Sequence, residues 1–430
     1  MADSGASSPG SSPVELRHCV DELLRFTLQS HVAGTLNLAF DLGLSVEFCS
    51  ALLRDDPCGH SPVSPSPSSE IVQGVPAYPL YKRLASALEE ALSSGVSFPR
   101  HESLAWFNQE DDIHNKKVLD QLISSKGAEL LNILKSIKFE LHVQEPYFTQ
   151  LKDGLKTIEG RCAHGNYKRI VSGDLILFNK CLVLEVQDVH WYASFFEMLG
   201  AECLSEVLPG VNSVAEGVQF YRKFYTEEKE KSNGVLAIGV SRSIDQPYIS
   251  LARIISGLTS KGVQKLLGLV HTAGTVPESL PPPRSALLSA FQLPYNPNVK
   301  GSTLTDGARA LAKHVNRSSD KYWGNFKGSG ENLGLLLVLY CCLIDLFHSS
   351  YNDIFLANSD SCKNELAKDV ISRLVATCQW QNLHAGPPHG VVFEIRDVSG
   401  YGARWSEDGL KFIGFLEPYV KDGHVKGWKH

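Results

Sequence analysis

The chain has 430 residues, of which 43% are hydrophobic and 20% are charged, and its formal net charge is -6. This composition is typical of a globular protein with room for two or three domains. The negative net charge excludes a protein that coats nucleic acid over its whole surface. It still permits a local basic cleft, because phosphate binding depends on clustered Lys and Arg side chains.

The N-terminal part of the sequence predicts a helical region. Residues 1–15 are small and polar, so we expect a disordered tail and no secretory signal. Apolar residues at helical spacing then predict helices over residues 16–135, interrupted by a Pro/Ser-rich loop at residues 55–70. The periodic residues of the first helix are Val20, Leu23, Leu24, Thr27 and Leu28.

At Lys138 the pattern changes to alternation, and "KFELHV" predicts a half-buried strand. Pro146 opens a short helix and Gly154 closes it. Four later stretches read as strands, and a charged helical stretch precedes the last of them. Strands broken by short helices predict a small β-barrel with helical insertions over residues 136–245.

Three charged residues follow Gly154 in the stretch "GLKTIEGR". Glu159 and Arg161 share one face of an extended strand, and Lys156 joins them only if the backbone bends after Gly154. Such a trio can pair internally and bind a phosphate or the edge of a nucleobase, with Arg as a donor fork and Lys as a mobile charge. The alternative is an ordinary solvated surface.

These residues also carry a resemblance to a known family. The G-x-K-x-x-E-x-R signature of the ASCH domain, a relative of the PUA β-barrel fold, is matched by Gly154, Lys156, Glu159 and Arg161. The Pro146–Tyr147 pair before the short helix and the Gly173–Asp174 turn follow the family's order. The chain resembles plant-type members most, and the ASCH domain of the transcription coactivator activating signal cointegrator, over about residues 138–242.

The resemblance implies a cleft that faces RNA or a nucleotide-like ligand, in the nucleus, the cytoplasm or both, with transcription-related proteins as further partners. The residues that we expect to contact the ligand are Gly154, Lys156, Glu159, Arg161, Tyr147, Asp174, Arg222 and Lys223. Some family members are amidohydrolases of acetylated cytidine or ribonucleases, and Lys156 and Glu159 are then the catalytic candidates. The chain has Glu159 where the amidohydrolases have a Thr, so hydrolysis is the alternative, and a protein-interaction scaffold is the third.

The stretch "VQFYRKFYTEEKEK" places aromatic and basic residues together. Arg222 and Lys223 can reach a ligand while neighbouring rings stack on bases. Phe220 and Phe224 have the i, i+4 spacing by which a helix docks onto a barrel, and we favour this packing role for them.

The ten cysteines form no C-x-x-C pair and predict reduced thiols in an intracellular protein. Zinc bound by Cys378, His384 and His389 is an alternative, but their spacing matches no common zinc motif. We expect no metal and no cofactor. The sequence has no P-loop, dinucleotide-binding, zincin or serine-hydrolase motif.

Residues 246–286 predict a helix and a Pro-rich linker, and residues 287–430 an α+β region. Its end alternates strand-like runs with glycine turns, so Tyr401, Trp405, Phe412 and Phe415 are either core residues or, with Arg404, a basic aromatic surface.

Residues 330–359 differ abruptly in composition from their surroundings, and we interpret them as a possible splice-derived insertion. Their apolar run Leu333–Phe347 is too short to span a bilayer, so we expect a short buried helix, with a membrane anchor as the alternative and no stable membrane insertion.

The fold class expected for the whole chain is therefore α+β: a helical N-terminal region, a central PUA-like (ASCH) β-barrel with helical insertions, and an α+β C-terminal region.

Overall fold

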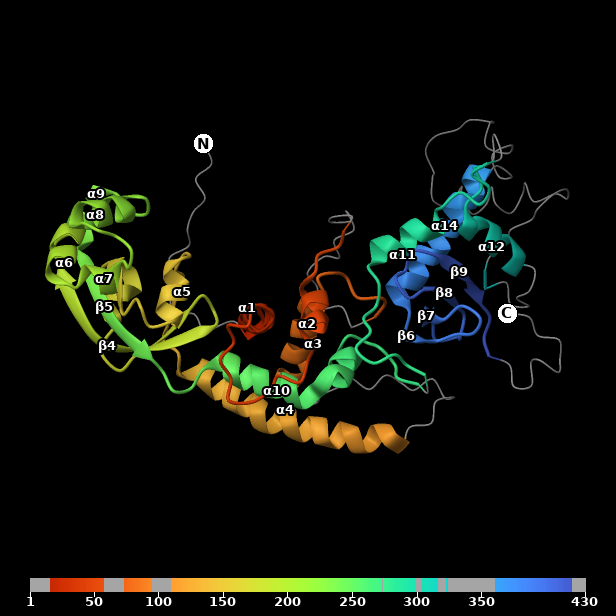
Figure 1. The fold of residues 1–430 in the computed structure, drawn as a ribbon, viewed down its shortest axis with the longest axis horizontal. Helices are drawn as coiled ribbons and strands as arrows, with labels where there is room; N and C mark the ends of the chain where they lie inside the picture. Colours follow the sequence, from red (N-terminus) through yellow and green to blue (C-terminus); the bar gives the residue numbers. More distant parts are fainter. Residues whose placement is uncertain are drawn as a thin grey trace, which may run out of the picture. The chain divides into compact units, whose positions relative to one another are not determined.

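The computed structural model describes a large part of the chain: residues 16–57, 73–94, 110–272, 274–298, 303–315, 322–323 and 360–419. The expected tail at 1–15, most of the loop at 55–70 and the segment 330–359 lie outside the described residues. The described residues group into two compact units (Figure 1). The first unit contains those within Met1–Ser50, Ala85–His101 and Asn108–Thr259, and the second contains the others.

Helices alone precede the first strand in the described part of the chain. They are α1 (Leu16–Val32), α2 (Val46–Leu53), α3 (Leu80–Ser94) and α4 (Glu110–Ser136). The predicted apolar stripe of α1 is fully buried, including Thr27, whose hydroxyl donates a hydrogen bond to the carbonyl of Leu23. The helical prediction for this region is confirmed where the structure describes it.

The first unit contains a five-stranded sheet that curls into a half-barrel (Figure 1). In chain order its strands are β1 (Phe139–Leu141), β2 (Ile158–Cys162), β3 (Leu175–Phe178), β4 (Leu182–Tyr192) and β5 (Val235–Arg242). They lie in the order β1-β3-β4-β5-β2, and only the β1–β3 pair is parallel. The sequence predicted a barrel, and the sheet is curled with β1 and β2 as its two edges.

Short helices cover this sheet: α5 (Tyr147–Lys152), the 3-10 turn Gly165–Arg169, α6 (Phe195–Ala201), α7 (Leu204–Val207), α8 (Val214–Arg222) and α9 (Glu227–Asn233). Ser194, Ser213 and Thr226 begin three of them, and each side chain accepts a hydrogen bond from a backbone N–H of the first turn. α6 packs against β4, β5 and α8 around a core that includes Phe195, Met198, Tyr221 and Val235.

Helix α10 (Pro247–Leu266) follows β5 directly. Its regular backbone is interrupted at Thr259, which has a φ of 57° and a ψ of 177°. The first unit ends at this residue.

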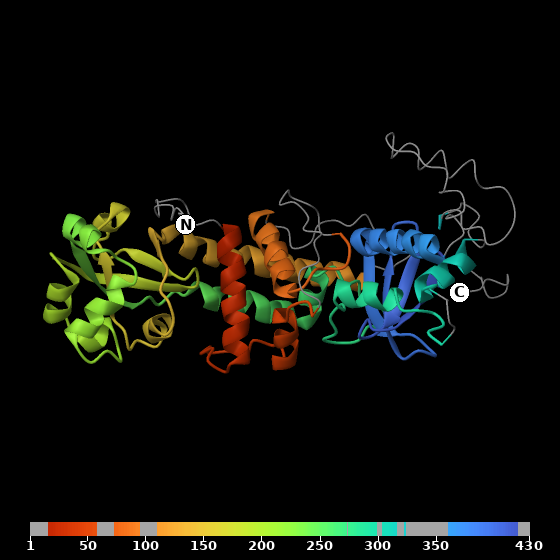
Figure 2. The same cartoon turned by 90° about the horizontal axis from the view of Figure 1, so that it is seen from above.

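The second unit is a four-stranded antiparallel meander with helices on one face (Figure 2). Its elements are α11 (Arg284–Phe291), α12 (Asp306–His314), α14 (Asp360–Thr377), β6 (Trp380–Ala385), β7 (Val391–Arg396), β8 (Gly402–Ser406) and β9 (Phe412–Leu416). The predicted glycine-turned meander is confirmed, because Tyr401, Trp405 and Phe415 are buried and Phe412 is half-buried. Within the described ranges, no helix is long and apolar enough to cross a bilayer.

Candidate functional site

The site begins at the turn between α5 and β2. Gly154 has a φ of +74°, the left-handed conformation expected of a glycine that ends a helix, and a Cβ there would meet no neighbouring atom. The next two backbone N–H groups, of Leu155 and Lys156, both donate to the carbonyl of Gln150. This turn is the backbone bend after Gly154 that the sequence required for Lys156 to join Glu159 and Arg161. It directs Lys156 into the interior.

Lys156 and Glu159 form a buried ion pair. They are only 2% and 6% exposed, and Lys156 Nζ lies 3.1 Å from Glu159 Oε2. Lys156 Nζ also donates to the carbonyl of Ile158 at 2.6 Å and to that of Val207 in α7. The three hydrogens of the ammonium group are therefore matched by three acceptors of the chain itself.

Arg161 completes the trio from the same face of β2. Its Nε lies 2.8 Å from Glu159 Oε1, and its Nη2 donates to the carbonyl of His142 at 2.5 Å. Because His142 directly follows β1, this bond joins the two edges of the half-barrel. Arg161 also interacts with the hydroxyl of Tyr225.

Burial and mutual attraction set the protonation of the trio. Burial lowers the pKa of Lys156, although the charge of Glu159 opposes this. For Glu159, burial alone would raise the pKa, but Lys156 and Arg161 outweigh it and the pKa falls below its usual value. Burial also disfavours the charged form of Arg161, yet Glu159 raises its pKa. With Lys156 protonated, the trio carries a net charge of one positive unit.

A pocket of about 270 Å³ opens against this trio. It is lined by aromatic rings from α5, α8 and the segment after α8, and by residues of β2 and of the segment after β1. Its lining residues are His142, Val143, Gln144, Tyr147, Lys156, Glu159, Gly160, Arg161, Leu208, Phe220, Tyr221, Phe224 and Tyr225. The pocket therefore joins Tyr147 to the predicted trio Lys156, Glu159 and Arg161.

The packing role predicted for Phe220 and Phe224 is corrected in part by the structure. Tyr221 and Gly217 are buried, and the Tyr221 ring stacks on Phe195 with centroids 4.1 Å apart. Phe224 follows the helix, is 44% exposed and lines the pocket, with Phe220 half-buried beside it. Phe220 also packs against this core, as predicted, so only the role predicted for Phe224 is wrong.

Two of the residues expected to contact the ligand shape turns outside the pocket lining. Gly154 ends α5, as described above. Asp174 is buried, and its carboxylate accepts hydrogen bonds from Lys138 Nζ at 2.7 Å and from the backbone N–H of Val171 at 2.9 Å. These contacts hold the turn at Gly173.

Arg222 and Lys223, the two basic residues expected to reach the ligand, also do not line the pocket. Arg222 forms an ion pair with the buried Glu230, whose carboxylate also accepts from the backbone N–H of Phe195 at 2.6 Å. Lys223 is exposed, and its Nζ lies 5.8 Å from the centre of the Phe220 ring.

Sequence reasoning missed His142 and Gln144. Both are exposed residues directly after β1, on either side of the buried Val143. Continuing the strand alternation beyond Val143 would have placed them on one face. It would not have shown that this face meets β2, because that contact arises from the curl of the sheet.

In the second unit the charged residues form their own network. Glu394 in β7 is 3% exposed and accepts from His384 Nε2 at 3.2 Å, Arg396 Nε at 2.6 Å and Arg404 Nη2 at 2.6 Å. Arg404 is thus held on the sheet. No group of three potential metal ligands is found in the described residues, and His384 faces Glu394 while Cys378 is buried.

Comparisons with known proteins concern the part of the chain that carries this site. Residues 141–243 match the ASCH domain family. The hypothetical protein PH0355 has 43% sequence identity over 24% of this chain and 98% of its own, with a TM-score of 0.24. Protein PF0455 from Pyrococcus furiosus has 42% identity over 25% of this chain and 98% of its own, with a TM-score of 0.23. None of the curated proteins matches the chain. Residues 141–243 therefore form an ASCH domain, a PUA-like fold associated with RNA binding.

Proposed function

We propose that the ASCH domain binds RNA, or a nucleotide within it, through the pocket at Arg161. The observation that supports this most directly is the pairing of an exposed aromatic ring, Phe224, with a site of net positive charge in one pocket. Single-stranded RNA is recognised through bases stacked on aromatic rings and through cations near its phosphates.

The residues of the trio have different parts in this proposal. The guanidinium group has five N–H donors, of which Nη2 donates to the carbonyl of His142, while Nε lies beside Glu159 but has no hydrogen-bond partner in the described structure. Arg161 is therefore the group that reaches a phosphate or a base acceptor. Lys156 and Glu159 are positioning residues that fix the orientation of the Arg161 guanidinium.

Hydrolysis of acetylated cytidine or of RNA is less well supported. A lysine nucleophile needs a free lone pair, which a lowered pKa favours. In this site, however, Lys156 directs its three hydrogens to Glu159 and two carbonyl oxygens. Release of acetate from acetylated cytidine by the purified chain would reverse this preference.

The cellular setting is a proposal that rests on the resemblance alone. RNA metabolism or transcription coregulation, in the nucleus or the cytoplasm, agrees with an RNA-binding pocket carried between further structured regions. A scaffold for transcription-related proteins is the other reading of those regions.

Replacement of Phe224 by Ala tests the stacking part of the proposal. Phe224→Ala should weaken binding of a single-stranded RNA of about ten nucleotides by about tenfold or more, since one stacked base contributes about 1–3 kcal/mol. Fluorescence anisotropy of labelled RNA measures this. The matched control is Phe196→Ala, because Phe196 is 65% exposed on α6 and does not line the pocket. Equal affinities for the two variants would contradict the proposal.

The charge contribution is tested in the same assay. Arg161→Gln should weaken binding and reduce the slope of log K against log salt by about 0.7, the value for one phosphate contact on a single strand. Arg169→Gln removes the same charge from an exposed position outside the pocket and should leave the slope nearly unchanged.

A further inference from the structure

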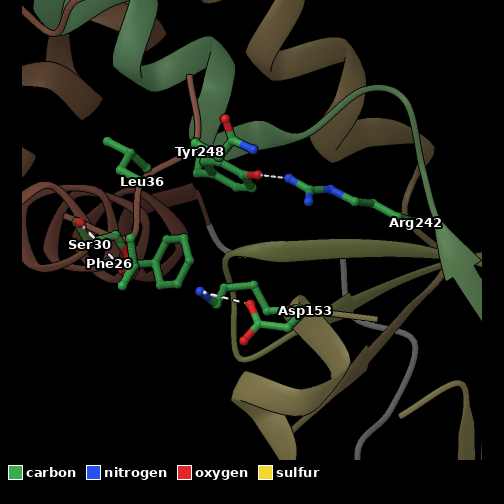
Figure 3. A pocket seen from close by; sticks show the side chains of 9 residues that line it. Phe26, Ser30, Leu36, Asp153, Arg242 and Tyr248 are labelled. Carbon is green, nitrogen blue, oxygen red and sulfur yellow. Dashed lines mark hydrogen bonds and ion pairs between the residues drawn. The ribbon is translucent and has the colours of Figure 1, made fainter. Parts of the chain in front are cut away.

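A second pocket of about 340 Å³ lies in the first unit (Figure 3). The end of α1 and the loop after it contribute Phe26, Ser30 and Thr35, and α10 contributes Tyr248. Figure 3 shows Phe26, Tyr248, Arg242 and Asp153 around a common space. Because α1 and α10 lie outside residues 141–243, this pocket joins the ASCH domain to elements beyond it.

The charges of this pocket favour an anionic ligand. Arg242 donates to the hydroxyl of the buried Tyr248 and has no carboxylate partner among the described residues (Figure 3). Lys152 pairs with Asp153 at 3.2 Å. The lining therefore carries two positive charges against one negative charge, and the guanidinium of Arg242 retains donors for a phosphate.

Two helices end beside the pocket, and their carbonyl groups are hydrogen-bonded locally. The carbonyl of Ser30 near the end of α1 accepts from the N–H groups of Thr35 and Leu36, at 2.9 and 3.0 Å. At the end of α5, the carbonyl of Gln150 accepts from Leu155 and Lys156. These bonds satisfy the carbonyl groups of Ser30 and Gln150 within the chain.

The two pockets lie at opposite ends of α5. Tyr147 begins this helix and lines the first pocket, whereas Lys152 ends it and lines the second. Six residues of α-helix span about 9 Å. Successive nucleotides of one strand are about 3.4 Å apart along the axis of B-DNA, and on this scale a few nucleotides cover the length of α5.

We propose that the pocket at Arg242 binds a second phosphate group of the same RNA strand, a few nucleotides away from the base held at Arg161. This proposal rests on RNA binding by the first pocket. Arg242 and Lys152 meet the phosphate, and the ring of Phe26 offers an apolar surface to the adjoining base.

The dependence of affinity on RNA length tests this, with the full chain and two labelled probes, an RNA dinucleotide and a single-stranded RNA of about ten nucleotides. The dinucleotide occupies the first pocket only, and the longer RNA reaches both. Arg242→Gln should weaken the affinity for the longer RNA by about tenfold, as expected for the loss of one charge-assisted contact. The affinity for the dinucleotide should stay unchanged. Arg253→Gln is the control, since Arg253 lies on α10 outside the pocket.

Two further variants guard against an indirect effect of the lost bond to Tyr248. Asp153→Asn removes the negative charge of the lining and should increase the affinity for the longer RNA about threefold. A merely structural role for Asp153 does not explain such an increase. Asn37→Glu adds a negative charge at an exposed lining position and should weaken the affinity for the longer RNA.

The outcomes separate the two proposals. If the longer RNA binds Arg242→Gln and Asn37→Glu as tightly as the unchanged chain, the second pocket is refuted and the first stands. If neither probe binds the unchanged chain, or if Arg161→Gln leaves both affinities intact, RNA binding by the first pocket itself fails.

Discussion

At the scale of single residues, the ASCH signature describes a buried electrostatic network more than a row of ligand contacts. Lys156 is bound by Glu159 and two carbonyl oxygens, and Arg161 extends from this network to the carbonyl of His142. A mobile surface lysine would not need this enclosure. The spacing of the three residues brings Lys156 to one carboxylate oxygen of Glu159 and Arg161 to the other.

Removing the buried ammonium should therefore destabilise the protein. Lys156→Met leaves the carboxylate of Glu159 buried with Arg161 as its remaining partner, and we expect a loss of about 3–5 kcal/mol in the free energy of unfolding of the first unit. Urea unfolding followed by circular dichroism measures this loss.

The matched control for this prediction is Lys223→Met, because Lys223 is exposed and should change stability by less than about 0.5 kcal/mol. The double variant Lys156→Met/Glu159→Gln should recover part of the loss, since it removes the stranded charge as well. A Lys156→Met protein as stable as the control would show that the ion pair contributes little.

At the scale of elements, the sequence predicted what depends on local pattern. The stripe of α1, the strands β1 to β5 and the turn at Gly154 follow from periodicity and from the conformational freedom of glycine. The packing role predicted for Phe224 was wrong, because Phe220, Tyr221 and Phe224 are all aromatic and it is Tyr221 and Phe220 that pack against the core. Composition alone cannot distinguish which ring meets the core when apolar residues occupy neighbouring positions of a helix.

The decisive neighbour of α8 is a glycine on β2. A Cβ at Gly160 would overlap the hydroxyl of Tyr221 and approach Met198 Cε to 2.8 Å. Gly160→Ala should therefore push α8 away from the sheet and lower stability by about 1–3 kcal/mol, the usual effect of overpacking. It should also alter the pocket wall and weaken RNA binding.

The control for this change is Gly200→Ala in α6, where an added Cβ meets no neighbouring atom. Alanine is favoured over glycine in a helix, so this variant should be neutral or more stable by up to about 1 kcal/mol. Thermal unfolding distinguishes the two. A stable Gly160→Ala protein would mean that α8 does not pack as closely on β2 as described.

At the scale of the whole molecule, the α+β class was accessible from the sequence, whereas the long-range contacts were not. The bond from Arg161 to His142 joins residues that are 19 positions apart, and it depends on the curl of the sheet. The same holds for the pocket at Arg242, whose lining comes from four separate stretches of chain. Patterns of local spacing contain no information on such contacts between residues that are far apart in the sequence.

Among the described residues, each compact unit contains a glutamate buried between cations, Glu159 in the first and Glu394 in the second. Burial alone would raise the pKa of Glu394. The hydrogen bond from His384 and the charges of Arg396 and Arg404 outweigh this and lower the pKa from 4.5 to about 2. Acid should therefore act on the stability of both units through a buried carboxylate.

The pH dependence of the second unit follows from this shift. A carboxylate whose pKa is lower in the folded state stabilises the protein above its unfolded pKa of 4.5 and loses this contribution as the pH falls toward 2. Between these pH values the unchanged chain should lose about 3 kcal/mol more than Glu394→Gln does. Urea unfolding at each pH, followed by tryptophan fluorescence, measures this, because Trp405 lies in the core of that unit.

Glu407→Gln, at an exposed position of the same unit, is the control and should keep the original pH dependence. Parallel curves for Glu394→Gln and the unchanged chain would show that the cations do not hold Glu394 ionised.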